Sequence, residues 1–166
     1  MDLILRFKPW QLFVILLIPW VFSWFSSFTG IWDSLFLLVY VGWAYAIGIK
    51  MNALIPESTR RGTKLFKIYF WLFVAMCLLV NNILVYTRVV MDNGTVFSIV
   101  FAFVYLYLLI NIWMFAARML ESMIEGYVVN RSDALKAFFC FWFFPFGIWY
   151  IQPAVQRVLT KYEQQP

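Results

Sequence analysis

Residues 95–117 read TVFSIVFAFVYLYLLINIWMFAA and contain no charged side chain. An α-helix rises about 1.5 Å per residue, so roughly 20 apolar residues are enough to cross a bilayer core about 30 Å thick. Asn111 is the main polar interruption of this run. The run therefore predicts a helix that spans a membrane.

The composition of the whole chain points the same way. Of its 166 residues, 64% are hydrophobic and 13% are charged, whereas a soluble domain has roughly 45–50% apolar and about 25% charged residues. Lipid allows the outside of a protein to be as apolar as its inside. The aromatic content of 22% fits a membrane protein as well, because Trp and Tyr gather at the headgroup level. We therefore predict an all-α, polytopic bundle of transmembrane helices.

Three more long apolar runs lie upstream of residues 95–117. Together they predict about four spanning helices in a single transmembrane domain, residues 1–166, with spans at 10–28, 34–54, 65–87 and 95–117. Pro19 is expected to kink the first helix. Thr29, Gly30 and Asp33 are expected to form a short turn before the second.

A fifth apolar run, residues 137–151, is too short to be read in the same way. It has about 15 residues where a span needs about 20, and Pro145 and Gly147 interrupt it. We expect a broken segment that either enters the bilayer and returns or lies at its interface. Residues 153–166 would then form a cytoplasmic tail.

The distribution of basic residues predicts the orientation, because Lys and Arg favour the cytoplasmic side. With a cytoplasmic N-terminus, only Arg88 falls outside the cell. The basic residues on the cytoplasmic side of the four spans would be Arg6, Lys8, Lys50, Arg60, Arg61, Lys64, Lys67, Arg118, Arg131 and Lys136. A C-terminal segment that does not span keeps Arg157 and Lys161 on that side too.

Three motifs resemble a known family. They are KPWQLF at 8–13, GTKLFK at 62–67 and WFFPFGIWYIQP at 142–153. Together they resemble an uncharacterised family of small bacterial inner-membrane proteins with a C-terminal Trp-Phe-Phe-Pro-x-Gly-x-Trp-x-x-Gln-Pro motif. That family usually has a basic residue directly after the last proline, where this chain has Ala154 and delays the charge to Arg157. The resemblance implies a bacterial inner membrane and this topology, but no activity.

Two sets of polar residues are candidate sites. Asn81, Asn82 and Asn111 lie within predicted spans, where they either form hydrogen bonds between helices or line a polar path. A basic cluster is formed by Arg60, Arg61, Lys64 and Lys67. These side chains are expected to hold their loop inside, and they are candidate contacts to the headgroups of membrane lipids, at about 1 kcal/mol each. Nothing indicates nucleic-acid binding.

Catalytic groups are scarce. The chain has no histidine, and its carboxylates lie in loops, tails or at helix ends. We therefore predict no enzyme activity, no metal and no cofactor. Cys77 and Cys140 are expected to be reduced, because each lies inside an apolar run.

Three functions are open at this point. The first is a non-enzymatic membrane protein that self-associates or serves as a subunit of a membrane complex. The second is a small oligomeric channel or pore, of a kind used in bacterial defence. The third is an interfacial lipid-modifying enzyme using Glu121 and Glu125, which are four residues apart on one helical face.

Overall fold

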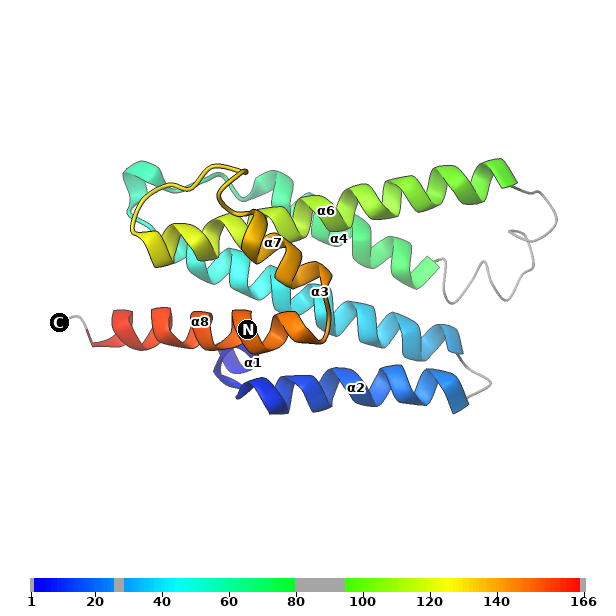
Figure 1. The fold of residues 1–166 in the computed structure, drawn as a ribbon. Coiled ribbons are helices and arrows are strands. Elements are labelled where there is room, and N and C mark those ends of the chain that lie inside the picture. The colour runs from blue at the N-terminus through cyan, green and yellow to red at the C-terminus, as the bar shows by residue number, and fades with distance from the viewer. Residues whose placement is uncertain (1, 26–28, 80–94, 165–166) are drawn as a thin grey trace.

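The computed structural model describes residues 2–25, 29–79 and 95–164, and this part of the chain is all-α (Figure 1). No strand occurs in those ranges. The α-helices are α1 (Asp2–Arg6), α2 (Pro9–Phe25), α3 (Thr29–Leu54), α4 (Lys64–Leu79), α6 (Thr95–Glu125), α7 (Leu135–Trp142) and α8 (Phe146–Glu163), and a short 3₁₀-helix, η1 (Glu57–Thr59), precedes α4. The all-α prediction is confirmed.

Helices α2, α3, α4 and α6 lie lengthwise beside one another, and successive helices run in opposite directions (Figure 1). Helix α3 is central and packs against α2, α4 and α6. The largest fully buried side chains include Trp43, Ile47 and Met51 of α3, with Phe73 and Ile112 of its neighbours. The core is therefore built around α3 from large apolar side chains.

Two small residues of α3, Ala44 and Gly48, are used for packing within the chain. Ala44 is fully buried. Gly48 lies against Phe66 and Phe115, and a Cβ placed there would come within 2.7 Å of the Phe66 ring. Small side chains at this spacing let neighbouring helices approach closely. Here the neighbours that approach are α4 and α6.

The turn predicted at Thr29–Asp33 is wrong, because α3 already begins at Thr29. Helix α2 ends at Phe25, so the change of direction falls at 26–28, outside the described residues. A single glycine costs a helix only about 1 kcal/mol. Gly30 was therefore too weak a signal to outweigh the apolar residues that follow it.

Two described helices, at Ile31–Leu54 and Ile99–Glu125, are long and apolar enough to cross a membrane by length and composition. Helix α2 has 17 residues and α4 has 16, both shorter than the roughly 20 that a span needs. The predicted third span, 65–87, continues past the described residues.

The C-terminal apolar run forms a hairpin of two helices. Helix α7 ends at Trp142 and α8 begins at Phe146, with a cis peptide bond between Phe144 and Pro145. The Phe144 ring lies 5.3 Å from the rings of both Phe36 and Tyr40. Figure 1 shows the turn partway along the bundle, from which α8 runs back toward the end where α7 started. The run is therefore not one continuous helix.

Gly147 allows the two arms of this hairpin to touch. A Cβ at this position would lie 1.5 Å from the carbonyl oxygen of Cys140, a separation that no side chain permits. The break itself lies before it, at Phe143–Pro145, and Gly147 belongs to the first turn of α8. Its role is close helix contact, whereas the sequence had suggested a break.

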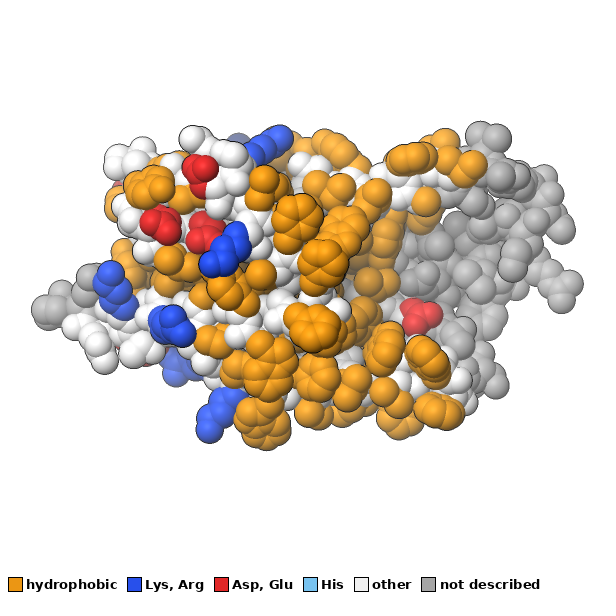
Figure 2. Space-filling view, viewed as in Figure 1, with side chains coloured by type: hydrophobic (Ala, Val, Ile, Leu, Met, Phe, Trp, Pro, Cys, Tyr) orange, Lys and Arg blue, Asp and Glu red, His pale blue; other side chains and the backbone are white. Residues whose placement is uncertain are grey.

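Charged and apolar side chains occupy different parts of the surface. On the face shown in Figure 2, the Lys and Arg side chains gather over the half of the molecule that contains the C-terminal end of α8, together with most of the acidic side chains, while exposed apolar side chains and one acidic side chain cover much of the remainder. Large examples are Trp71, 63% exposed, Phe103, 69% exposed, and Phe146, 78% exposed. We call the half with the Lys and Arg side chains the charged end.

Candidate functional site

A cavity of about 350 Å³ opens between α4 and α6 at the charged end. Three arginines line it: Arg61, Arg118 and Arg131. The other lining residues are mostly apolar: Gly62, Leu65, Phe66, Tyr69, Asn111, Met114 and Phe115. None of these described lining residues is acidic. We call this cavity the arginine pocket.

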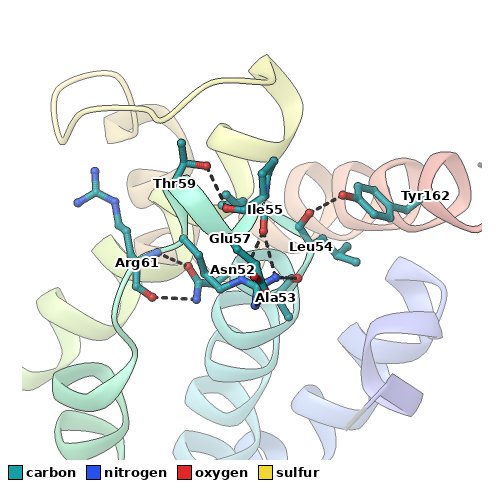
Figure 3. Close-up of polar contacts among 10 residues, drawn as sticks. Asn52, Ala53, Leu54, Ile55, Glu57, Thr59, Arg61 and Tyr162 are labelled. Carbon is teal, nitrogen blue, oxygen red and sulfur yellow. Dashed lines mark hydrogen bonds and ion pairs between the residues drawn. The ribbon is translucent and has the colours of Figure 1, made fainter.

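Asn52 fixes the backbone from which the Arg61 side chain extends. Its side chain is buried in the last turns of α3. The amide nitrogen Nδ2 donates to the carbonyl of Arg61 at 3.0 Å, and Oδ1 accepts from the Arg61 backbone N–H, also at 3.0 Å. Figure 3 shows the Arg61 guanidinium pointing away from this pair of bonds. Within the guanidinium group, the Nε atom is buried and has no hydrogen-bond partner.

The loop after α6 carries Arg131 back to the pocket. Helix α6 ends at Glu125, and Gly126 has a φ of 78°, the left-handed conformation that commonly ends a helix. The loop is held on α6 by two contacts: the Val129 N–H donates to Ser122 Oγ at 3.0 Å, and the Arg118 guanidinium donates to the Val129 carbonyl at 3.4 Å. Arg118 also lies within the electrostatic reach of both Arg61 and Arg131.

The structure divides the predicted basic cluster. The guanidinium of Arg60 donates to the carbonyls of Ala53 and Ile55, at 2.9 and 3.2 Å, and so caps the C-terminus of α3. Lys64 and Lys67 are exposed and do not line the arginine pocket. Only Arg61 of the predicted cluster reaches it. Sequence reasoning missed that Arg118 and Arg131 join Arg61, because that depends on the path of the loop.

The predicted polar path falls mostly outside the described residues, since Asn81 and Asn82 are not among them. Asn111 is half-buried, and its amide donates to the carbonyl of Tyr107 in its own helix at 2.8 Å. It also lines the arginine pocket. In the described part of the chain, Asn111 therefore bonds within α6 and contributes to this pocket.

Glu121 and Glu125 occupy different environments. Glu121 is 7% exposed, and its Oε1 atom has no hydrogen-bond partner, whereas Glu125 is exposed. Lys136 attracts the Glu121 carboxylate and Glu125 repels it. The Lys136 ammonium lies 4.8 Å from the ring centre of Tyr150. Interaction with Tyr150, assisted by the charge of Glu121, raises the pKa of Lys136 above its ordinary value.

A buried glutamine joins three parts of the fold. Gln152 of α8 is fully buried. Its Oε1 accepts from the Trp43 indole N–H at 2.8 Å, and its Nε2 donates to the carbonyls of Leu5 and Phe7 at 3.0 and 2.7 Å. One side chain thus connects α8, α3 and the N-terminal segment. Sequence reasoning missed Gln152. The signal that could have found it is its place in the apolar Trp-Tyr-Ile-Gln-Pro stretch, which favours a polar contact but does not name the partners.

Comparisons with protein-family models, curated proteins and solved structures find no match to this chain. The chemistry of the arginine pocket is therefore inferred from its own side chains.

Proposed function

We propose that the chain is a multi-pass protein of a bacterial cytoplasmic membrane that acts by binding rather than by catalysis. The observation that carries this proposal is the separation of the surface into a charged end and an apolar remainder (Figure 2). A soluble monomer rarely exposes a contiguous apolar patch of more than a few hundred Å².

The exposed apolar side chains suit a lipid environment. On α6 they include Ile99, Phe103 and Tyr107, at four-residue spacing and thus on one face, and on α4 they include Ile68 and Trp71. Leaving such surface in water costs about 25 cal/mol per Å². Hydrocarbon removes this penalty, because lipid tails are as apolar as the side chains.

The proposed topology has four spans, with the N-terminus in the cytoplasm. Helices α3 and α6 are the two long spans, and the apolar runs 10–28 and 65–87 supply the other two. On the face shown in Figure 2, the Lys and Arg side chains lie at the charged end. That end would therefore face the cytoplasm, since short cytoplasmic loops are rich in Lys and Arg.

In this topology, α7 and α8 form a re-entrant hairpin. Phe143 and Phe146 flank its turn and are both exposed, while Phe144 packs inward against Phe13, 6.4 Å away, and α3. Non-helical backbone at membrane depth has to be shielded by protein. The packing of Phe144 on α2 and α3 supports such shielding. Arg157 and Lys161 then stay in the cytoplasm with the rest of the basic residues.

Binding rather than catalysis is proposed because the most developed polar feature, the arginine pocket, lacks acidic groups among its described lining residues. The binding partners are membrane lipids together with a second copy of the chain or another membrane protein. Gly48 and Ala44 are occupied by packing within the chain. The exposed face of α6 is therefore the better candidate for contact with a second protein.

Cysteine accessibility tests the topology. In a background with Cys77→Ala and Cys140→Ala, single cysteines are placed at the exposed positions Asp33, Ser58 and Thr160. A membrane-impermeant maleimide added to spheroplasts is expected to label position 33, and to label 58 and 160 only after the membrane is opened. Labelling of position 58 in sealed spheroplasts would contradict the proposed orientation. Release of the protein by alkaline carbonate would contradict membrane insertion.

Self-association requires a separate measurement. The mass of the detergent-solubilised protein, with the bound detergent subtracted, is expected to exceed that of one chain or to include a co-purifying partner. A substitution on the exposed face of α6, Phe103→Ala, is expected to weaken that assembly, with Leu35→Ala on exposed α3 surface as its matched control. A strict monomer without a partner protein would refute the assembly.

A further inference from the structure

We infer that the arginine pocket binds the phosphate group of an anionic membrane lipid, with the acyl chains lying along α4 and α6. This inference rests on the proposed function, because it requires the charged end to meet the headgroup layer. The lipid contact is assigned to three side chains: Arg61, Arg118 and Arg131. Of these, only Arg61 belongs to the basic cluster that was predicted from the sequence.

The charges of the pocket favour an anion. Three arginines line one cavity without a carboxylate among its described lining residues, and the positive charges of Arg61 and Arg131 act on Arg118. Like charges held together in a partly buried site repel one another. A bound phosphate relieves that repulsion and accepts hydrogen bonds from several guanidinium N–H groups at once.

The donors are already in position. The two hydrogen bonds from Asn52 fix the backbone of Arg61 (Figure 3), and the Nε atom of that arginine is buried without a partner. A buried donor without an acceptor costs about 1–3 kcal/mol. Because Arg61 lines the pocket, an anion bound there would lie beside this guanidinium group.

The pocket also lies beside the start of α4, because its lining includes Gly62, two residues before the helix, and Leu65 in the first turn. The first N–H groups of a helix have no partner within the helix, and the helix dipole places partial positive charge there. Helix α4 has 16 residues. Its N-terminus therefore adds to the attraction that the three arginines exert on phosphate.

The shape of the pocket favours a lipid over a free anion. From Arg118 to Asn111 the lining extends along two turns of α6, about 10 Å. Toward Asn111 the lining becomes apolar and aromatic, with Phe66, Tyr69 and Met114. A free phosphate would occupy only the arginine half, whereas a phospholipid matches both halves. Arg118 directly follows the predicted span 95–117, which is the level of lipid headgroups.

Lipid titration of the full-length protein, followed by native mass spectrometry, tests the assignment. The probes are phosphatidylglycerol and phosphatidylcholine. Wild-type protein is expected to bind phosphatidylglycerol at least about tenfold more tightly than phosphatidylcholine, since one charge-assisted hydrogen bond changes the affinity by about that factor. Equal affinity for the two lipids would overturn the inference.

Charge-matched variants locate the binding site. Arg61→Gln and Arg131→Gln are each expected to weaken phosphatidylglycerol binding about tenfold. Lys64→Gln and Lys67→Gln remove the same charge from the same region outside the pocket, and less than a twofold change is expected. Asn52→Asp retains the acceptor for the Arg61 N–H but loses the donor to the Arg61 carbonyl, and an intermediate loss is expected. Equal losses in the arginine and lysine variants would show a diffuse surface field and overturn the pocket.

A competition arm separates a lipid from a soluble anion. Excess inorganic phosphate at constant ionic strength is expected to leave phosphatidylglycerol bound. Displacement of the lipid by inorganic phosphate but not by sulfate would assign the pocket to a soluble phosphate instead.

If carbonate extraction shows stable insertion while lipid selectivity is absent, the lipid site fails and the proposed function stands. If insertion itself is absent, the proposed function fails first.

Discussion

Replacement of Gln152 by leucine is the sharpest test of the packing at the charged end. The side chain is fully buried and makes three hydrogen bonds of 2.7 to 3.0 Å, to Trp43, Leu5 and Phe7. At about 1 kcal/mol each, their loss amounts to about 3 kcal/mol, or roughly a hundredfold in the ratio of folded to unfolded protein. The leucine leaves the Trp43 indole N–H and the Leu5 carbonyl without these partners, while the Phe7 carbonyl keeps its bond from Gln156.

The assay is reversible chemical denaturation in mixed micelles, followed by tryptophan fluorescence. Gln156→Leu is the matched control on the same helix. Gln156 is half-buried and donates to the Phe7 carbonyl at 2.7 Å, and water can replace that bond, so a loss of less than about 1 kcal/mol is expected. A second readout is maleimide labelling of a cysteine at Leu5, which is 1% exposed, and this labelling should accelerate in Gln152→Leu as the N-terminal segment detaches from α8.

The variant Gln152→Glu adds a pH dependence with a definite sign. A carboxylate accepts from the Trp43 N–H but cannot donate to the Leu5 and Phe7 carbonyls, and burial disfavours its charge. Its pKa in the folded protein should therefore be raised, and the variant should gain stability as the pH falls and the donating carboxyl form appears. If Gln152→Leu is within about 0.5 kcal/mol of wild type, or if Gln152→Glu is insensitive to pH, the polar contact is not structural.

Three other substitutions, and one control at Gly42, follow from the local surroundings of single residues, and each is measured by the same denaturation experiment. Gly147→Ala should prevent the hairpin from forming, because its Cβ would lie 1.5 Å from a carbonyl oxygen of α7, whereas Gly42→Ala has open space and should gain up to about 1 kcal/mol in helix propensity. Arg60→Ala should cost about 1 kcal/mol through loss of the α3 cap. Glu163→Gln should change stability by less than about 0.5 kcal/mol, because its ion pair with Arg6 is largely exposed.

Each of these predictions has a contradicting result. Wild-type stability in Gly147→Ala would mean that α7 and α8 do not touch at this point. A loss in Gly42→Ala as large as in Gly147→Ala would show that any added methyl group is harmful. No effect of Arg60→Ala would place its guanidinium in solvent or on lipid. A large effect of Glu163→Gln would mean that the C-terminal end of α8 is held by that ion pair.

Features that depend on local composition could be predicted from the sequence. Uncharged runs such as 95–117 indicate helices wherever they lie in the chain. Gly126 marks the end of α6, because the residue that ends a helix in the left-handed conformation is most often glycine. The start of α3 was misplaced because Gly30 and Asp33 are weak signals in the presence of strong apolar neighbours.

The site was harder to predict, because it is made by contacts between distant segments. Gln152 donates a hydrogen bond to the carbonyl of Leu5, which is 147 positions away in the sequence. The sequence near either residue does not indicate that the two are in contact. Arg131 reaches Arg61 only because Val129 bonds back to Ser122. Arg60 and Arg61 are neighbours with the same charge, yet one caps α3 and the other faces the pocket. Their separation depends on the direction of the chain after Pro56.

The hairpin of α7 and α8 makes the described bundle uneven in thickness. Its two helices lie beside α2, α3 and α6 only in the half toward the charged end (Figure 1). In the proposed orientation, the protein would displace more lipid from the inner leaflet than from the outer one. A protein that is wider in the inner leaflet fits best where that leaflet has the larger area. The protein should therefore gather at membrane regions that bulge toward the cytoplasm.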